Sequence, residues 1–121
     1  NLKYVGFVED DKILSEYYAL SDIFCFPSVA ENCPLSLLEA MASGLTCIAF
    51  NIPPVKEIIE NEAGILTETN DLAELANAIK MLMTNRSKFK QYSKNARLKI
   101  ETNYSQSDFI GKHLDLYSKH L

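Results

Sequence analysis

The sequence of 121 residues lacks several features that mark common classes of protein. It has no apolar run of 18 residues and no signal-peptide pattern, so we expect no membrane-spanning segment and no secretion signal in it. It also has no excess of cations, because 12 Lys and Arg stand against 16 Asp and Glu. The net charge of −4 argues against a protein built mainly to bind nucleic acid or acidic membranes.

Cysteine is scarce, and its spacing does not suit a zinc site or a disulfide framework. The chain has three cysteines, Cys25, Cys33 and Cys47, with no CxxC pair among them. Two of them lie in apolar runs, and the number is odd. We therefore expect buried free thiols in a reducing compartment, which favours a cytoplasmic location.

Cations are absent from a long central stretch that carries several carboxylates. No Lys, Arg or His occurs from Ile13 to Val55, whereas Glu31 and Glu39 lie near its middle. A carboxylate taken out of water without a cation or hydrogen-bond donors is costly. Ligand hydroxyls, backbone N–H groups, a metal or residues outside this sequence could satisfy these groups.

Short apolar runs alternate with helical patterns in the first half of the chain, and helical patterns fill the second half. The runs at 4–8, 23–26 and 46–50 predict strands, and residues 62–67 predict a turn and a fourth short strand. Helical spacing predicts helices at 12–20, 35–43, 55–60, 71–83, 87–101 and 105–121. Uninterrupted apolar strands that alternate with helices indicate a parallel sheet. We therefore predict one α/β domain over residues 1–121, with a Rossmann-like parallel sheet, flanking helices and two or three helices at the end.

The central segment PSVAENCPLSLLEAMASG, residues 27–44, reads as a loop followed by a helix. Pro34 suits the first helical position, and Gly44 suits the stop. The helix is apolar nearly all round, which predicts a buried helix whose only polar stripe carries Ser36, Glu39 and Ser43. A plainer interpretation stays open, in which Glu31 caps the helix and Glu39 is simply solvated.

The loop before this helix follows a predicted strand, so it lies at the carboxyl edge of the sheet. Ligands of parallel α/β sheets bind in the crevice beyond that edge. A helix N-terminus there favours phosphates, and carboxylates suit the hydroxyls of ribose or a sugar. The pattern therefore predicts a site suited to a sugar nucleotide.

The residues from Glu31 to Gly44 resemble the E-x7-E signature of the retaining GT-B glycosyltransferases of group 1. The resemblance covers essentially the whole chain, through segments at 5–8, 21–28, 52–59, 63–66, 104–105 and Tyr117. Two loops depart from the usual pattern. Asn32-Cys33-Pro34 replaces a frequent Gly-Phe-Gly, and Pro53-Pro54 replaces a frequent Gly-Gly.

The resemblance implies a role for each matching residue. Glu39 would bind the ribose hydroxyls, and Glu31 would act as the catalytic residue that contacts the donor sugar. The remaining donor-binding residues would be Asn32, Cys33, Pro34, Leu35 and Ser36 around the diphosphate, and Gly6, Phe7 and Val8 near the nucleobase. No cofactor is expected, because the nucleotide sugar is a substrate, and the resemblance implies no essential metal.

The implied enzyme would transfer a sugar from a UDP-, GDP- or ADP-sugar to a glycan, lipid or other hydroxyl acceptor, with retention. The family's phosphate-binding Arg and Lys and its acceptor-binding N-terminal domain have no counterpart in this sequence. The chain begins at Asn1 without a Met, and we expect it to be the C-terminal, donor-binding piece of a longer protein. By itself it would be inactive.

Two other interpretations of the chain stay open. The acidic residues Glu9, Asp10 and Asp11 also resemble the metal-binding cluster of a response-regulator receiver domain, a signalling module, although no Asp follows a later strand. The second alternative interpretation is a Rossmann-like domain without catalytic activity. Six cations between Arg86 and Lys99 form either a solvated face or a peripheral contact with an anionic membrane or partner.

Overall fold

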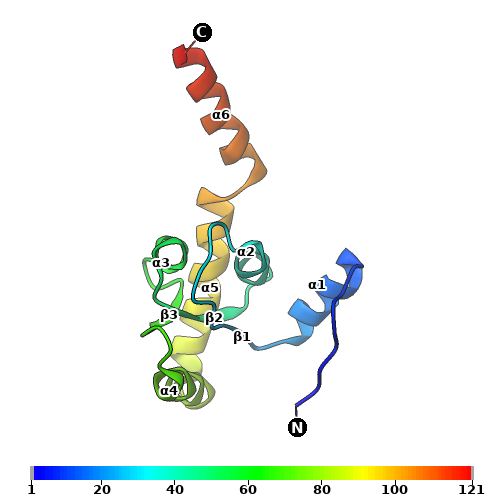
Figure 1. Ribbon diagram of the computed structural model, residues 1–121, viewed down its shortest axis with the longest axis vertical. Coiled ribbons are helices and arrows are strands. Elements are labelled where there is room, and N and C mark those ends of the chain that lie inside the picture. Colours follow the sequence, from blue (N-terminus) through cyan, green and yellow to red (C-terminus); the bar gives the residue numbers. More distant parts are fainter. Residues whose placement is uncertain (1, 121) are drawn as a thin grey trace.

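The computed structural model describes residues 2–120, and Figure 1 shows how its elements are arranged. Asn1 and Leu121, the ends of the expected domain and of its closing helix, lie outside the described residues. The elements in chain order are α1 (Asp11–Leu20), β1 (Ile23–Phe26), α2 (Leu35–Ala42), β2 (Thr46–Phe50), α3 (Pro53–Ile59), β3 (Gly64–Thr67), α4 (Leu72–Thr84), α5 (Arg86–Asn103) and α6 (Gln106–His120). In this described part, no helix is long and apolar enough to cross a membrane.

The three strands form one parallel sheet in the order β1-β2-β3. Ile23 pairs with Thr46, and Cys47 pairs with Gly64. Every residue of the central strand β2 is buried. The prediction of a parallel α/β sheet is confirmed, but the expected burial of its strands holds fully only for β2, because β1 and β3 are mostly half-buried.

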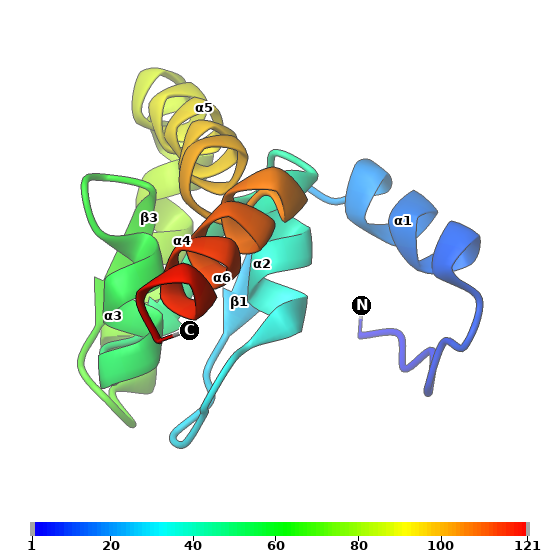
Figure 2. The ribbon, with the colours of Figure 1, turned by 90° about the horizontal axis from the view of Figure 1, so that it is seen from above.

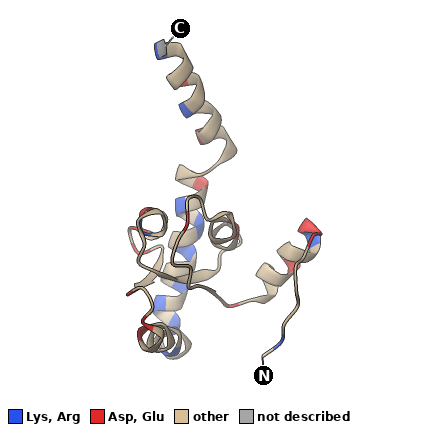
Figure 3. Cartoon of the chain, viewed as in Figure 1, with Lys and Arg blue, Asp and Glu red and all other residues tan. Residues whose placement is uncertain are grey.

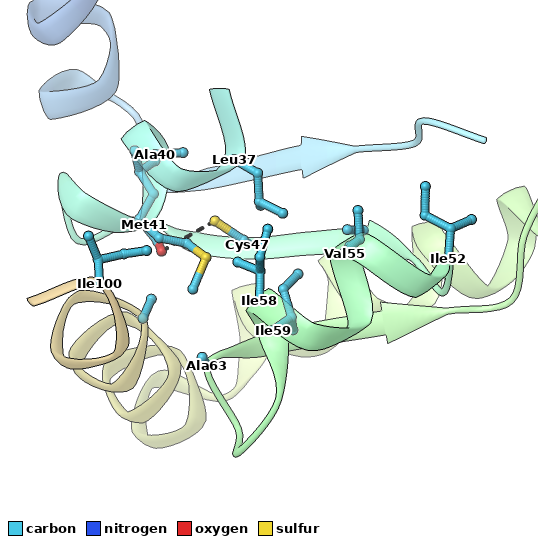
Figure 4. Packing of buried hydrophobic residues seen from close by; sticks show 13 residues of the cluster. Leu37, Ala40, Met41, Cys47, Ile52, Val55, Ile58, Ile59, Ala63 and Ile100 are labelled. Atoms are coloured by element: carbon cyan, nitrogen blue, oxygen red, sulfur yellow. Dashed lines mark hydrogen bonds between the residues drawn. The ribbon is translucent and has the colours of Figure 1, made fainter. Parts of the chain in front are cut away.

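Helices cover both faces of the sheet and make two apolar clusters. Cys47 and Ala49 of β2 point to the face covered by α2 and α3, where the larger cluster lies (Figure 4). Ile48, between them, points to the opposite face and packs with Ala78 and Leu82 of α4. Because successive side chains of a strand point to opposite faces of the sheet, β2 contributes residues to both clusters.

Helix α5 packs along the amino ends of the strands and contacts both clusters. The hydroxyl of Thr46 donates to the carbonyl of Phe89 at 3.0 Å, and that of Ser93 donates to the carbonyl of Gly44 at 2.6 Å. Thr46 is the first residue of β2, so α5 occupies the amino edge of the sheet. The carboxyl edge is left to the loops that follow the strands, as the expected site requires.

The prediction of a strand at residues 4–8 is wrong. Residues 2–10 have no regular secondary structure, and Tyr4 and Phe7 are 93% and 88% exposed. Gly6 has a φ of +73°, which lies outside the β region. A strand also needs a neighbouring backbone for its N–H and C=O groups, and this segment is not paired with β1.

Helix α2 departs from its prediction at both ends and in its burial. Pro34 is the N-cap rather than the first helical residue, and the helix ends at Ala42 with Ser43 as C-cap. Only one face is buried, through Leu37, Ala40 and Met41, whereas Leu35 is 64% exposed. The helix is therefore half-buried, because the sheet covers one side of it and its outer side faces solvent.

The long helices of the second half occur as predicted, with small shifts at their starts. Asp71 caps α4 by accepting from the N–H of Glu74 at 2.8 Å. Asn85, not Ser87, caps α5 by accepting from the N–H of Lys88 at 3.0 Å. Ser105 accepts from the N–H of Asp108 at the start of α6, which extends away from the sheet in Figure 1.

Candidate functional site

The start of α2 has free backbone N–H groups. Its N-cap, Pro34, is buried and supplies only its carbonyl, which accepts from the N–H of Leu37 and of Leu38. No side chain caps this helix. Among the described residues, the N–H groups of Leu35 and Ser36 have no acceptor, so they remain available to an anion at the positive end of the helix dipole.

Glu31 lies in the loop between β1 and α2 and does not cap the helix. Its Oε1 accepts a hydrogen bond from the hydroxyl of Ser28 at 2.7 Å. This contact folds the loop back on itself just past the end of β1. Asn32 and Cys33, the next two residues, are exposed. The interpretation of Glu31 as a helix cap is therefore wrong.

Glu39 is exposed on α2, and a side chain from another helix holds it. The hydroxyl of Tyr18, on α1, lies 3.2 Å from Oε2 of Glu39 and 3.4 Å from the carbonyl oxygen of Ser36. Partial burial, together with the Glu39 carboxylate, raises the pKa of Tyr18 to about 12. The phenol is thus protonated near neutral pH and donates to the carboxylate.

A cavity of about 420 Å³ lies between the N-terminal segment, α1 and α2. It brings together five of the residues that the sequence predicts for the donor site, namely Gly6, Phe7, Val8, Ser36 and Glu39. Its other lining residues include Leu14, Tyr17, Tyr18 and Phe24. Figure 2 shows the N-terminal segment beside α1, across from α2.

The other predicted donor-site residues do not line this cavity. Glu31, Asn32, Cys33, Pro34 and Leu35 belong to the loop and the first turn of α2, beyond the carboxyl end of β1. The predicted site therefore has two parts, a cavity and an adjoining loop. Neither Glu31 nor Glu39 forms an ion pair within residues 2–120.

Sequence reasoning missed the role of α1 in this site. Helical spacing predicted a helix at residues 12–20, a range that includes Tyr17 and Tyr18. Nothing in that spacing showed that the helix lies against the polar stripe of α2. The fold alone shows that the Tyr18 hydroxyl reaches the carboxylate of Glu39, which forms no ion pair within residues 2–120.

The three cysteines differ in exposure. Cys47 is buried, and burial raises the pKa of its thiol to about 12. Cys25 and Cys33 are exposed, so the expectation of buried thiols holds for Cys47 alone. Cys25 lies on β1, an edge strand of the sheet.

Comparison with known proteins gives a family match over most of the chain. Residues 1–99 match the family model of the glycosyl transferases group 1. An uncharacterized glycosyltransferase of Haemophilus influenzae is 39% identical over 99 residues, which cover 80% of this chain and 28% of that protein. An Escherichia coli protein is named UDP-Gal:alpha-D-GlcNAc-diphosphoundecaprenol alpha-1,3-galactosyltransferase. It is 38% identical over 98 residues, which cover 80% of this chain and 25% of that protein.

Solved structures agree with the sequence match. Sucrose-phosphate synthase from Thermosynechococcus elongatus superposes with a TM-score of 0.86 at 26% identity, covering 97% of this chain and 29% of that one. The C-terminal domain of a group 1 glycosyl transferase from Francisella tularensis gives a TM-score of 0.76 at 28% identity, over 84% of this chain and 53% of that one. The chain spans about a quarter of the length of the curated relatives described above.

Proposed function

The chain belongs to the group 1 glycosyltransferases, and we propose from that premise that it forms part of the donor site of an enzyme that uses nucleotide sugars. Its fold is that of the C-terminal part of a GT-B glycosyltransferase. The family match leaves the receiver-domain interpretation without support. In addition, Asp10 of the acidic cluster serves as the N-cap of α1, accepting from the N–H groups of Lys12 and Ile13.

The observation that carries the proposal is the cavity shared by Glu39 and the segment Gly6–Val8. At about 420 Å³ it falls within the usual size of small-molecule sites. We assign the ribose hydroxyls to the carboxylate of Glu39 and the nucleobase to Gly6–Val8. The diphosphate would then reach the free N–H groups of Leu35 and Ser36, with the donor sugar near Glu31.

The reaction that fits this assignment is sugar transfer with retention. The bond between the anomeric carbon of the sugar and the diphosphate oxygen breaks, and the acceptor hydroxyl oxygen bonds to that carbon on the same face. The acceptor proton passes to the departing diphosphate. The protein would contribute positioning and electrostatic stabilisation rather than a covalent intermediate.

Part of this chemistry needs groups that the described site does not supply. A departing diphosphate calls for cations, and from Ile13 to Val55 the sequence has none. We propose that an Arg and a Lys from preceding residues of a longer protein provide them, and that an N-terminal domain binds the acceptor. UDP-, GDP- and ADP-sugars are all candidate donors.

We further propose that the acceptor is a glycan or a lipid-linked group, met at the inner face of a membrane. The Escherichia coli relative is named for an acceptor on diphosphoundecaprenol. On α5, Arg86, Lys90, Lys94 and Arg97 recur at helical spacing, and Figure 3 shows cations along this helix. From residue 75 to residue 100 the sequence has no Asp or Glu. Such a cationic face suits peripheral contact with anionic lipid.

Vesicle binding tests the membrane part of the proposal. The full-length protein should bind vesicles containing phosphatidylglycerol, bind pure phosphatidylcholine vesicles more weakly, and lose the difference at high salt. The double variant Lys90→Glu/Lys94→Glu should lose this binding. The matched double variant Lys12→Glu/Lys56→Glu, which reverses two exposed cations away from α5, should keep it. Equal vesicle binding by both double variants would show that α5 is not the contact surface.

Nucleotide binding by the full-length protein tests the donor site. Titration with UDP, GDP and ADP should show one preferred nucleotide. Glu39→Gln should weaken that binding about tenfold, because an amide accepts more weakly than a carboxylate. Glu16→Gln, at an exposed glutamate of α1 outside the cavity, is the control and should bind like the wild type. No binding to any of the three nucleotides would refute the proposal.

A further inference from the structure

We propose that Tyr18 is a positioning residue of the donor site, which holds the Glu39 carboxylate in the orientation that accepts the ribose hydroxyls. This inference rests on the proposed function, because it assigns a partner to the carboxylate that would contact ribose. It adds a residue from α1, a helix outside the signature segment Glu31–Gly44. The observation behind it is the hydrogen bond that the Tyr18 hydroxyl donates to Oε2 of Glu39 at 3.2 Å.

The Tyr18 side chain is fixed by contacts on both its ring and its hydroxyl. The ring packs edge-on against Phe24 of β1, with the centroids 5.9 Å apart and the planes at 74°. Phe24 in turn stacks on Phe26 at 6.0 Å. The hydroxyl reaches both Oε2 of Glu39 and the carbonyl oxygen of Ser36, one turn earlier on α2. The phenol is thus held by the edge strand of the sheet and donates from a set position.

Glu39 has more freedom than Tyr18 and depends on this contact. It is exposed, it makes no ion pair within the described residues, and Tyr18 is its only side-chain hydrogen-bond donor there. A glutamate has three rotatable bonds, and an exposed one samples several rotamers. Removing the phenol hydroxyl would therefore release the carboxylate without disturbing the aromatic packing beneath it.

The pair also lies between two cavities. Leu14, Tyr18 and Glu39 line both the cavity of about 420 Å³ and a second one of about 330 Å³. The second cavity contains Ser43 but none of the residues Gly6–Val8. A released Glu39 could turn toward either space. The hydrogen bond from Tyr18 selects one orientation before the ligand arrives, which lowers the cost of binding.

The charge state of the pair suits this role. A tyrosine phenol is protonated at neutral pH, the more so with the pKa of Tyr18 raised to about 12. Since an ionised carboxylate can only accept, Tyr18 is the donor of this hydrogen bond. Oε1 of Glu39 has no hydrogen bond from the described residues, so it is free to accept from a ligand hydroxyl. One oxygen is therefore held by the protein while the other faces a possible ligand.

The experiment compares Tyr18→Phe with the wild type in the full-length protein, using calorimetric titration with the preferred nucleoside diphosphate and with its 2′,3′-dideoxy analogue. Tyr18→Phe should weaken binding of the ribonucleotide about tenfold and leave binding of the dideoxy analogue unchanged. Tyr92→Phe is the matched control. It removes a phenol hydroxyl from a partly buried tyrosine of the other apolar cluster, and it should bind both nucleotides normally.

A double-mutant cycle shows whether the hydroxyl acts through Glu39. In the Glu39→Gln background, Tyr18→Phe should weaken ribonucleotide binding less than twofold, because the carboxylate it positions is already gone. Thermal unfolding of each variant checks that the fold is kept. Equal loss of affinity for the ribonucleotide and the dideoxy analogue would indicate a general structural role and overturn the inference.

Other outcomes separate this inference from the proposed function. If the wild type binds the ribonucleotide better than the dideoxy analogue and Tyr18→Phe binds both as the wild type does, the donor site stands and the positioning role is refuted. Tighter binding by Tyr18→Phe would also refute it, since the phenol would then compete with ribose. If the wild type binds neither nucleotide, or both equally, the ribose assignment of Glu39 fails and this inference fails with it.

Discussion

Gly64, the first residue of β3, lies directly against the backbone of Cys47 in β2. A Cβ added to Gly64 would stand 2.7 Å from the carbonyl oxygen of Cys47 and 3.1 Å from Cγ2 of Ile59. The carbonyl belongs to the central strand, whose residues are all buried, so it cannot move aside without disturbing the sheet. Any side chain at position 64 therefore forces β3 away from β2.

We predict that Gly64→Ala lowers the free energy of unfolding by about 2 kcal/mol, in the range of overpacked cores. Urea denaturation followed by circular dichroism measures it. Gly111→Ala on α6 is the control, because a Cβ there meets nothing within 4 Å. The control should be neutral or slightly stabilising, since Ala is the better helix former. Two variants of equal stability would contradict the close approach of β3 to β2.

The cap of α5 gives a second stability prediction. Asn85→Ala should lower the free energy of unfolding by about 1 kcal/mol, because the side chain accepts from the N–H of Lys88. Ser87→Ala should change it by less than about 0.5 kcal/mol, because Ser87 is exposed within the first turn. The same denaturation experiment compares them. A larger effect at Ser87 than at Asn85 would contradict the assignment of Asn85 as the cap.

Most of the fold was predictable from the sequence, because three of the four predicted strands form and pair in one sheet. The run 46–50 is apolar after Thr46, and it is the buried central strand β2. The run 4–8 has a similar composition, yet it forms no strand. Composition marks a segment that can pair, whereas pairing depends on a neighbouring backbone that the segment itself does not reveal.

The candidate site was predictable only in part, for a related reason. The spacing of Ser36 and Glu39 on one stripe of α2 is a local property, and both residues line the cavity of about 420 Å³. The contact from Tyr18 joins residues 21 positions apart and depends on where α1 lies. No pattern within the helix 12–20 contains that information. The roles of Glu31, Glu39 and the loop residues in catalysis remain predictions.

Alkaline pH should destabilise the fold through Tyr18. Its pKa rises from the ordinary 10.0 to about 12 in the folded chain, because of burial and the nearby Glu39 carboxylate. Below pH 10 both states hold the proton, so the full contribution is present. Between pH 10 and pH 12 the unfolded chain releases it first, and the free energy of unfolding falls as pH rises.

The measurement for this pH effect is the free energy of unfolding at several pH values between 9 and 12, for the wild type and Tyr18→Phe. The free energy of unfolding should fall more steeply with pH for the wild type than for the variant over that window. Comparison with the variant is needed because Cys47 and Tyr104 also have raised pKa values and contribute to the same fall. Parallel curves for the two proteins would mean that Tyr18 has the same pKa in the folded and the unfolded chain.

These 121 residues alone should have no transferase activity. The described site offers carboxylates and backbone N–H groups, and no cation lies between Ile13 and Val55 to stabilise a departing diphosphate. Assays with UDP-, GDP- and ADP-sugars, with the full-length protein as positive control, should detect no turnover by the chain. Turnover above the background of a Glu31→Gln variant of the same chain would show that it contains a complete site.

The cysteines offer a chemical probe of the loop at the candidate site. Cys33 is exposed beside Glu31, whereas Cys47 is buried with a thiol pKa raised to about 12. At pH 8, N-ethylmaleimide should therefore modify Cys33 rapidly and Cys47 only after unfolding, as measured by peptide mass spectrometry. Because the proposed diphosphate position adjoins this loop, the preferred nucleotide sugar should slow modification of Cys33 in the full-length protein. Cys25, exposed on the edge strand, is the internal control, and equal slowing at both thiols would indicate a general tightening of the fold rather than a ligand over the loop.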